Sequence, residues 1–398
     1  MKEIAIVGGG ILGLAIGYKL SVSNGIYKIT LFEKENEIGK HQSGNNSGVL
    51  HCGLYYQPGS LKAKLAVEGV REMVSFCKKN YIRHEICGKI VVATDDWEST
   101  FLDKLAARGV QNGLNDLKYL NQNELKIREP YVSAKKSLLV PEEGIVDYKQ
   151  VMTVMSNYII EMGGEVCLNN EVISCVELDN GGLILKTRNV EKKFDLVVNC
   201  GGLHADRNYS NLTTNKSPIK IVPFRGEYLQ ISENYKHIVN HLVYPVPDPK
   251  YPFLGIHFTR MINGDREVGP NAVFALKREG YKNSDFSLKD TFDSITYRGF
   301  INFMVKNFSF AVGEFASSLS TKSFVSKAKK LIPEVEDYMF NKTGTAGVRA
   351  QALGPNGDLI MDFKIERYKN QIHVLNAPSP GATASLSIAK YIIENYIK

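Results

Sequence analysis

Three glycines near the start of the chain have the spacing of a phosphate-binding turn. Gly8, Gly10 and Gly13 follow an apolar, β-branched run and precede small and aliphatic residues typical of a helix. In such a turn the free amides at the helix N-terminus can approach a pyrophosphate closely. The next strand ends at Glu33, whose carboxylate can bind a ribose diol and would repel a 2′-phosphate. Strand, glycines, helix, strand and acid in this order predict a site for FAD or NAD, not NADP.

A second turn suited to a cofactor lies near the C-terminus. A predicted strand over 371–376 leads to Pro380 and Gly381, which indicate a helix N-terminus directly after them. The positive end of that helix dipole would stabilise negative charge on a reduced flavin ring. A nicotinamide ring becomes cationic when it loses a hydride and has no such need. The two turns together favour FAD.

The elements around these turns predict an α/β protein whose cofactor-binding half is discontinuous in sequence. A buried type of strand over 194–199 leads to Gly201 and Gly202, and we expect it to pair beside the first strand. Helices are expected over 61–80 and 148–162, with Ser60 as the N-cap of the first. The predicted Rossmann-like FAD-binding domain comprises 1–84, 145–221 and 341–398.

The rest of the chain is rich in strand patterns and is predicted to form an inserted substrate-binding domain. Short strands follow one another between 219 and 276, which favours a mostly antiparallel sheet. Helices are expected over most of 287–337, with further strands over 343–350 and 359–365. The substrate-binding domain is placed at 85–144 and 222–340.

Composition and charge exclude several classes of protein. The 398 residues are 43% hydrophobic and 23% charged, as in ordinary globular proteins. A net charge of +7 suits an anionic substrate, and the lack of a basic block argues against nucleic acid. Six cysteines without a C-x-x-C pair predict reduced core thiols and no metal site. With a strand starting at Ile4 and no long apolar run, we expect a cytoplasmic protein without a transmembrane segment; peripheral contact with the inner membrane face stays open.

Longer motifs extend over most of the chain. They are His41-x-Ser43-Gly44-x-Asn46-Ser47-Gly48-Val49-x-His51-x-Gly53-x-Tyr55-Tyr56, Pro58 to Ala63, Pro223 to Tyr228, His257 to Met261, Gly269 to Ala272, Lys277 to Tyr281 and Gly347 to Gln351. With these motifs the chain resembles the FAD-dependent D-amino-acid oxidase and glycerol-3-phosphate dehydrogenase superfamily. Within it, the chain resembles the L-2-hydroxyglutarate oxidase (dehydrogenase) family.

The resemblance implies noncovalent FAD and oxidation of L-2-hydroxyglutarate, a small anionic hydroxy acid, to 2-oxoglutarate. Electrons would pass to a quinone-type acceptor or to oxygen. Hydride transfer from C2 to flavin N5 requires a base for the hydroxyl proton, and His51 and His257 are the candidates. The residues expected to bind the dianionic substrate are Arg225, Arg260, Arg349, Tyr55 and Asn271. Arg278 and Arg298 are expected to be solvated surface residues.

The cofactor contacts are predicted on the glycine turns, the polar stretch after Glu33 and the C-terminal turn. They are Gly8, Gly10, Ile11, Leu12, Gly13, Glu33, Lys34, Ser43, Asn46, Ser47, Val172, Gly201, Gly202, Gly381, Ala382 and Thr383. Two alternatives stay open: a related flavoenzyme acting on glycerol 3-phosphate or an amino acid, and a flavin-binding subunit without activity of its own.

Overall fold

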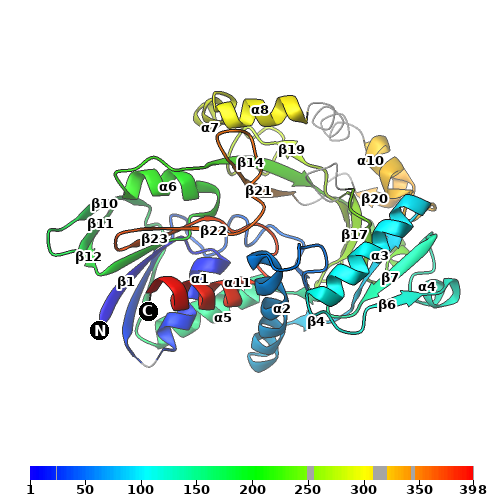
Figure 1. Cartoon of the computed structure of the whole chain (residues 1–398), viewed down its shortest axis with the longest axis horizontal. Coiled ribbons are helices and arrows are strands. Elements are labelled where there is room, and N and C mark those ends of the chain that lie inside the picture. Colours follow the sequence, from blue (N-terminus) through cyan, green and yellow to red (C-terminus); the bar gives the residue numbers. More distant parts are fainter. Residues whose placement is uncertain (24, 249–254, 308–320, 342–345, 398) are drawn as a thin grey trace.

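A six-stranded sheet forms the half of the molecule that carries both chain termini (Figure 1). The computed structural model describes all residues except 24, 249–254, 308–320, 342–345 and 398. The sheet order is β22–β23–β13–β1–β2–β9, parallel throughout except for the antiparallel pair β22 and β23. The strands are β1 (Lys2–Val7), β2 (Tyr27–Phe32), β9 (Glu165–Cys167), β13 (Leu196–Asn199), β22 (Lys364–Tyr368) and β23 (Gln371–Asn376). The predicted pairing of the strand after residue 194 with the first strand is confirmed.

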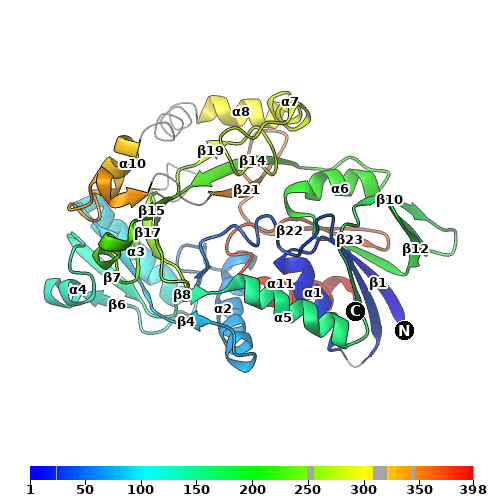
Figure 2. The ribbon, with the colours of Figure 1, turned by 180° about the vertical axis from the view of Figure 1, so that it is seen from behind.

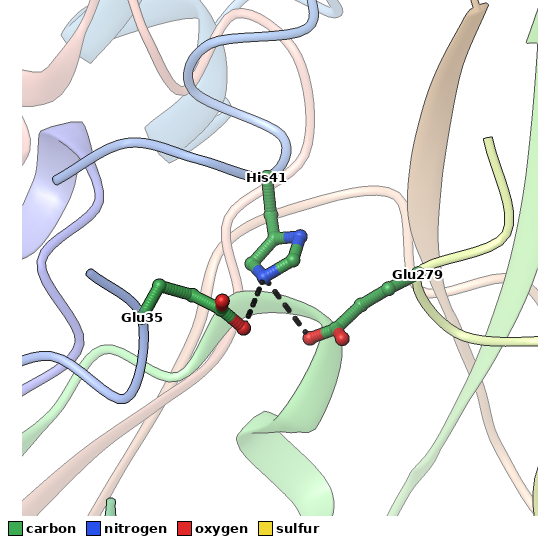
Figure 3. A group of neighbouring side chains, drawn as sticks. All are labelled: Glu35, His41 and Glu279. Carbon is green, nitrogen blue, oxygen red and sulfur yellow. Dashed lines mark hydrogen bonds and ion pairs between the residues drawn. The ribbon is translucent and has the colours of Figure 1, made fainter. Parts of the chain in front are cut away.

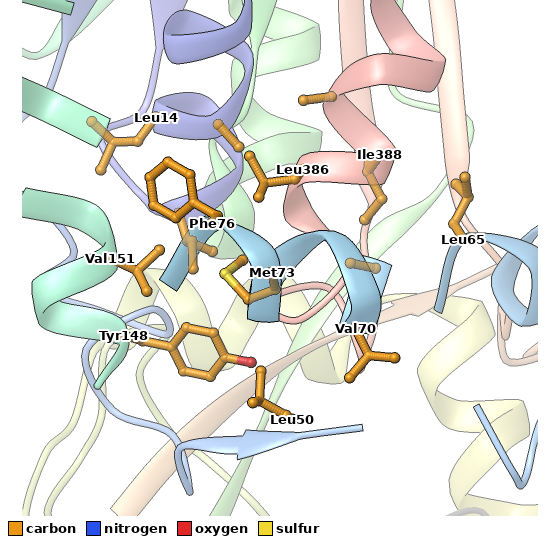
Figure 4. Close-up of a cluster of buried hydrophobic side chains, with 14 of the residues drawn as sticks. Leu14, Leu50, Leu65, Val70, Met73, Phe76, Tyr148, Val151, Leu386 and Ile388 are labelled. Atoms are coloured by element: carbon orange, nitrogen blue, oxygen red, sulfur yellow. The ribbon is translucent and has the colours of Figure 1, made fainter. Parts of the chain in front are cut away.

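Strand β1 is buried on both faces, which explains its unbroken apolar run. Ile4 and Ile6 point into a core shared with four helices, whereas Ala5 and Val7 pack against a second cluster on the other side. The four helices are α1 (Ile11–Ser21), α2 (Leu61–Lys79), α5 (Tyr148–Glu161) and α11 (Ser385–Ile392), which bring the two ends of the chain together (Figure 4). The Ser60 side chain accepts a hydrogen bond from the Ala63 amide, so the predicted N-cap is confirmed.

The other face of this sheet is covered by a small antiparallel sheet. It contains β10 (Val172–Glu177), β11 (Leu183–Thr187) and β12 (Glu191–Phe194). Phe194 packs edge-on against Phe32 of β2 at a centroid distance of 5.9 Å. The short η1 (Gly202–His204) and α6 (Ala205–Leu212) follow β13.

An eight-stranded sheet forms the second half, in the order β20–β15–β18–β17–β16–β5–β7–β6. All its pairs are antiparallel except β16 with β5, so the predicted sheet type is confirmed. The strands are β5 (Lys89–Ala93), β6 (Lys118–Leu120), β7 (Lys136–Val140), β15 (Leu229–Ile231), β16 (Leu242–Pro245), β17 (His257–Arg260), β18 (Arg266–Gly269) and β20 (Phe340–Asn341). The helices of this half are α3 (Asp96–Gln111), α4 (Gln122–Arg128), α10 (Thr321–Ala328), η2 (Glu233–Ile238) and η3 (Asp337–Met339).

Two three-stranded sheets connect the halves. One contains β3 (Val49–Leu50), β8 (Gly144–Val146) and β4 (His84–Glu85). The other contains β19 (Val273–Phe274), β14 (Lys220–Glu227) and β21 (Ala346–Leu353), and α7 (Leu288–Ile295) and α8 (Arg298–Lys306) lie beyond it (Figure 2). In the described part of 287–337 the helical prediction is confirmed, whereas 308–320 and the start of the predicted strand 343–350 lie outside the described residues.

Three local predictions are wrong. The short strands expected from residue 219 onward are divided differently: Lys220–Glu227, with Pro223 inside it, is the single strand β14 and pairs with β21 along its whole length, whereas β15 follows in another sheet. The strand expected over 359–365 begins at Lys364, and Ile360 instead donates its amide to Ala352. The C-terminal helix begins at Ser385 and not directly after Gly381, since turns occupy the residues between them. It continues as the π-helical η4 (Ile393–Ile397).

Candidate functional site

The turn between β1 and α1 has a backbone path that only glycine fits at two positions. Gly8 has a φ of +112°, and a Cβ there would lie 2.5 Å from the Cys200 carbonyl oxygen. A Cβ on Gly13 would lie 2.1 Å from the Gly8 carbonyl oxygen. These contacts bring α1 tightly against the turn, so its N-terminus points out of the carboxyl edge of the sheet.

The N-terminus of α1 offers amides for an anionic group. A Cβ on Gly10 would approach only the Ser43 hydroxyl, at 3.0 Å. The Ile11 amide donates to that same hydroxyl at 3.0 Å, and the amides of Leu12 and Gly13 lie in the first helical turn, where the helix provides no acceptor. The cradle therefore has the space and the donors that the pyrophosphate of FAD requires.

Glu33 lies beside this cradle at the end of β2. Its carboxylate accepts hydrogen bonds from the Gly9 amide at 2.7 Å and the Glu35 amide at 2.9 Å. These bonds fix the two oxygens and leave lone pairs for ribose hydroxyls. The Glu33 carbonyl accepts the Asn170 amide, so β10, which begins at Val172, starts close to the same position. The residues present thus fit the adenosine end of FAD.

Lys34, predicted to contact the cofactor, belongs to a cluster of titratable residues that also includes Glu35, His41 and Glu279, the three side chains drawn in Figure 3. Its ammonium contacts the Glu35 carboxylate and lies 2.6 Å from that of Glu279. His41 Nε2 lies 3.1 Å from Glu35 and 3.2 Å from Glu279, whose carboxylate also bonds His204 at 2.9 Å. Burial alone would raise the pKa of Glu35, but Lys34, His41 and Lys40 lower it to about 2.

This cluster also has the composition of a metal site. The ligand atoms of Glu35, His41 and Glu279 lie within 4.8 Å of one another. The Lys34 ammonium, however, already contacts both carboxylates, so a metal ion would have to displace a resident cation. The cluster therefore acts as an ionic link between the 39–48 segment and the 277–281 segment.

The 39–48 segment borders a cleft of about 280 Å³ whose lining also includes Tyr148, Tyr228 and Gly347. Asn46 fixes the turn, since its side chain donates to the Ser43 carbonyl and accepts the Gly48 amide. Ser47 follows in the same turn. Gly201 and Gly202 lie just after β13, where η1 begins, and a Cβ on Gly202 would lie 2.9 Å from the Gln42 side-chain oxygen.

The C-terminal turn reaches this segment through Thr383. The Thr383 hydroxyl lies 2.8 Å from the Tyr148 hydroxyl and 3.2 Å from both the Val49 carbonyl and the His51 amide. Gly381 and Ala382 precede it in the turn. The turn that the sequence assigns to a flavin therefore lies directly against the backbone of a predicted catalytic histidine.

His51 lies beside a buried ion pair. Its Nδ1 lies 3.4 Å from Glu143 Oε2, and Lys89 Nζ lies 2.6 Å from Glu143 Oε1. Glu143 and Lys89 are 1% and 0% exposed. Burial would raise the pKa of Glu143, but Lys89 and His51 together lower it to about 2. The carboxylate is thus charged at neutral pH and can hold the His51 ring in place, with Nε2 directed away from it.

His257, the second predicted base, also lies against the Tyr244 ring. The rings of His257 and Tyr244 stack at a centroid distance of 3.9 Å, and Tyr244 meets His51 edge-on at 6.3 Å. Burial lowers the pKa of His257 to about 3, and its Nδ1 faces the Gly255 carbonyl at 2.9 Å. His257 is therefore neutral at physiological pH, and its Nε2 is a hydrogen-bond acceptor.

The predicted substrate ligands separate into two groups. Tyr55 lies at the histidines, because the Lys89 ammonium is 4.4 Å from its ring centre. Arg349 lies near His257 and Tyr228: it contributes to the lowered pKa of His257, and it opposes the burial that raises the pKa of Tyr228. These two residues therefore lie at the same site as the histidines.

The other three ligands are occupied elsewhere. Arg225 lies opposite Val348 in the β14–β21 register whereas Phe224 lies opposite Arg349, so the two arginines leave opposite faces of that sheet. Arg225 instead bonds Glu227 at 2.9 Å, and Asn271 holds the same carboxylate at 2.7 Å. Arg260 forms a two-pronged pair with Glu85 at 2.8 and 2.7 Å, three residues along β17 from His257 and therefore on the other face.

Arg278 was expected on the surface, and this prediction is wrong. Its side chain is 2% exposed, donates to the Leu203 carbonyl at 2.6 Å and pairs with the buried Asp206. The partner lies 72 residues earlier, so no local pattern identified it. Arg298 is exposed, as predicted.

Lys89, Glu143 and Tyr244 were missed as site residues. Lys89 gave a usable signal, since a single cation inside the buried strand Lys89–Ala93 must find a partner. Glu143 lies in a polar turn between β7 and β8, where an acid is unremarkable. Tyr244 is one of many strand aromatics, and nothing in its neighbours distinguishes it.

Cys52 is fully buried, and its backbone amide and its thiol both lie against the Glu143 carboxylate. Its thiol lies 3.3 Å from Glu143 Oε1, and burial raises its pKa well above the usual value. A thiol in this state is a poor nucleophile. All six cysteines are free.

No helix in the described residues combines the length and apolar character needed to cross a bilayer.

Comparisons with known proteins identify the family to which the chain belongs. The family model for FAD dependent oxidoreductases matches residues 3–395. An L-2-hydroxyglutarate dehydrogenase from Indibacter alkaliphilus is 45% identical over 100% of this chain and 99% of its own length. The Escherichia coli K12 and human mitochondrial proteins of the same name are 40% and 39% identical, over 99% and 98% of this chain and 92% and 88% of theirs.

Solved structures share the fold at low sequence identity. An L-alpha-glycerophosphate oxidase from Mycoplasma pneumoniae with FAD bound has a TM-score of 0.78 and 21% identity, over 99% of this chain and 94% of that one. A glycine oxidase from Geobacillus kaustophilus has a TM-score of 0.73 and 16% identity with the same coverage. The predicted α/β fold and the FAD cofactor are confirmed. The chain belongs to the FAD-dependent oxidoreductase family and, within it, to the L-2-hydroxyglutarate dehydrogenase family.

Proposed function

We propose that this protein oxidises L-2-hydroxyglutarate to 2-oxoglutarate. Three full-length relatives with at least 39% identity carry that activity in their names, and this is the observation on which the proposal chiefly rests. Bound FAD would supply the acceptor for the hydride that leaves C2. The protein must remove the hydroxyl proton, position the two carboxylates and keep water from the reacting carbon.

We assign the base to His51. Its Nδ1 faces the charged Glu143, so Nε2 is the nitrogen free to take the hydroxyl proton while the C2–O bond becomes a carbonyl. The resulting imidazolium would be stabilised by the same carboxylate. His257 is held neutral by burial and is assigned as an acceptor that orients the hydroxyl or carboxylate.

We assign Arg349 to bind the negatively charged carboxylates of the substrate, with Tyr55 and Tyr228 as neutral hydrogen-bond partners. A dicarboxylate needs cationic groups, and Lys89 is largely neutralised by its contact with Glu143. Arg225, Arg260 and Asn271 are given structural roles, since their pairs with Glu227 and Glu85 already satisfy them.

We retain the two-domain division, with one change. The eight-stranded sheet is drawn from 89–140 and 229–341, close to the proposed substrate-binding segments 85–144 and 222–340. Residues 346–353 form β21 and pair with β14, so they belong with the connecting sheet and not with the FAD-binding segment that begins at 341.

Reduced flavin would pass its electrons to a quinone-type acceptor or to oxygen, in a cytoplasmic protein that contacts the membrane peripherally.

The test is anaerobic mixing of the flavin-loaded protein with single substrates. L-2-Hydroxyglutarate should bleach the flavin absorbance, and the D-isomer, glycerol 3-phosphate, glycine and proline should do so much more slowly. Faster bleaching by any of these four would overturn the substrate, and no bleaching by any compound would favour a flavin-binding subunit without activity. His51→Asn should slow bleaching, whereas the exposed His237→Asn serves as the matched control.

A further inference from the structure

Helices α7 and α8 follow one another along an outer edge of the molecule (Figures 1 and 2). The inner side of α8 is packed: Phe300 and Phe303 are buried, and their rings lie 6.4 and 5.9 Å from the Phe224 ring of β14. The helix therefore contributes an apolar face to the core, as amphipathic helices do.

The outer side of both helices is apolar as well. In α7 the exposed Leu288, Phe292 and Ile295 recur at the spacing of one helix face, and in α8 Ile301 and Val305 do the same. Leu288, Phe292 and Val305 are 77%, 67% and 73% exposed. Ordinary surface helices present polar residues on this side, so a row of large apolar side chains indicates an interaction surface.

The exposed charges on and around these two helices are mainly positive. They are Lys282, Lys289, Arg298 and Lys306, and one acid, the exposed Asp358, lies 3.6 Å from Lys306. The acids of α7 are paired, since Asp290 and Asp293 lie 2.6 and 3.0 Å from the Arg207 guanidinium. A second copy of this face would bring cations against cations, whereas an anionic surface complements it.

We propose that the α7–α8 face docks the protein onto an anionic lipid bilayer. Apolar side chains flanked by cations are the combination that inserts into the boundary between headgroups and acyl chains. Docking is peripheral and reversible, because the two helices have 8 and 9 residues. Docking rests on the proposed function in one respect only: if reduced flavin passes its electrons to a lipid-soluble quinone, docking brings the reduced enzyme within reach of it.

The experiment is flotation of the holoenzyme with phosphatidylcholine vesicles, with and without phosphatidylglycerol. The wild type should float with the anionic vesicles, remain below with the neutral ones, and lose binding as salt rises. Leu288→Ser/Phe292→Ser/Val305→Ser and Lys289→Glu/Arg298→Glu should each reduce partitioning at least about tenfold. All these side chains are exposed, so both variants should keep wild-type flavin reduction by L-2-hydroxyglutarate with a soluble dye as acceptor.

A matched control changes exposed apolar residues on other elements: Val110 of α3, Ile127 of α4 and Val176 of β10, each to Ser. It should float like the wild type. The proposal is overturned if the wild type ignores anionic vesicles, if the α7 and α8 variants float unchanged, or if the control loses binding equally. A wild-type dimer that the triple variant dissociates, without vesicle binding, would assign the face to self-association. Failure of the proposed function is seen separately, as absent bleaching in the soluble assay.

Discussion

Removal of the Lys89 ammonium is expected to destabilise the protein strongly. Lys89 Nζ lies 2.6 Å from Glu143 Oε1, and neither side chain reaches solvent. Lys89→Met replaces the unbranched stem by one that is a single atom shorter, and it leaves a buried carboxylate whose nearest cation is gone. Loss of one partner from a buried pair costs about 3–5 kcal/mol of unfolding free energy. Solvent does not screen this pair, so we expect the full loss of unfolding free energy.

A double-mutant cycle separates charge from packing. Glu143→Gln should cost a similar amount, because it leaves the ammonium unpaired, whereas the double variant removes both charges and should cost far less than the sum. Equilibrium urea unfolding, followed by circular dichroism with and without FAD, measures each corner. Lys118→Met is the control, since its pair with Glu124 is solvated and its loss should hardly change the unfolding free energy.

The pH dependence of the unfolding free energy tests whether the charge on Glu143 is what Lys89 stabilises. The pKa of Glu143 is lowered from 4.5 to about 2, so its pairing stabilises the fold above pH 4.5 and this contribution disappears as pH falls through about 2. The penalty of Lys89→Met should therefore be largest at neutral pH and shrink on acidification, as the carboxyl becomes protonated. A penalty below about 1 kcal/mol, an additive double variant, or a penalty that grows toward acid would refute the reasoning.

Three further outcomes are expected. His51→Asn should retain bound flavin while the rate of its reduction by L-2-hydroxyglutarate falls roughly 10²- to 10⁴-fold in stopped-flow absorbance; an unchanged rate would remove it as the base. Gly13→Ala should lower the melting temperature of the apoprotein, because its Cβ meets a backbone oxygen at 2.1 Å, whereas Gly10→Ala should fold and show mainly weaker FAD binding by titration. Equal apoprotein melting of the two would contradict this. The pKa of His257 is lowered from 6.5 to about 3, so stability falls as pH drops below 6.5 toward 3, and His257→Gln should flatten that part of the unfolding curve.

The sequence by itself determined the cofactor turn and the family. Gly13 meets the Gly8 carbonyl oxygen within the same turn, and Glu33 accepts the Gly9 amide within the same β1–α1–β2 unit, so these constraints act inside one short segment of the chain. The spacing of the glycines and the acid therefore indicates the turn without knowledge of the rest of the fold. The capping serine of α2 is equally local.

Only the tertiary structure decided which charged residues meet. Lys89 and Glu143 are 54 residues apart, and Arg278 and Asp206 are 72 apart, so their pairing depends on how separate segments pack. Arg225 and Arg349 have similar local patterns, but the register of β14 with β21 directs them to opposite faces. Burial and partner choice are properties of the assembled sheets, and electrostatic energies at a site follow from both.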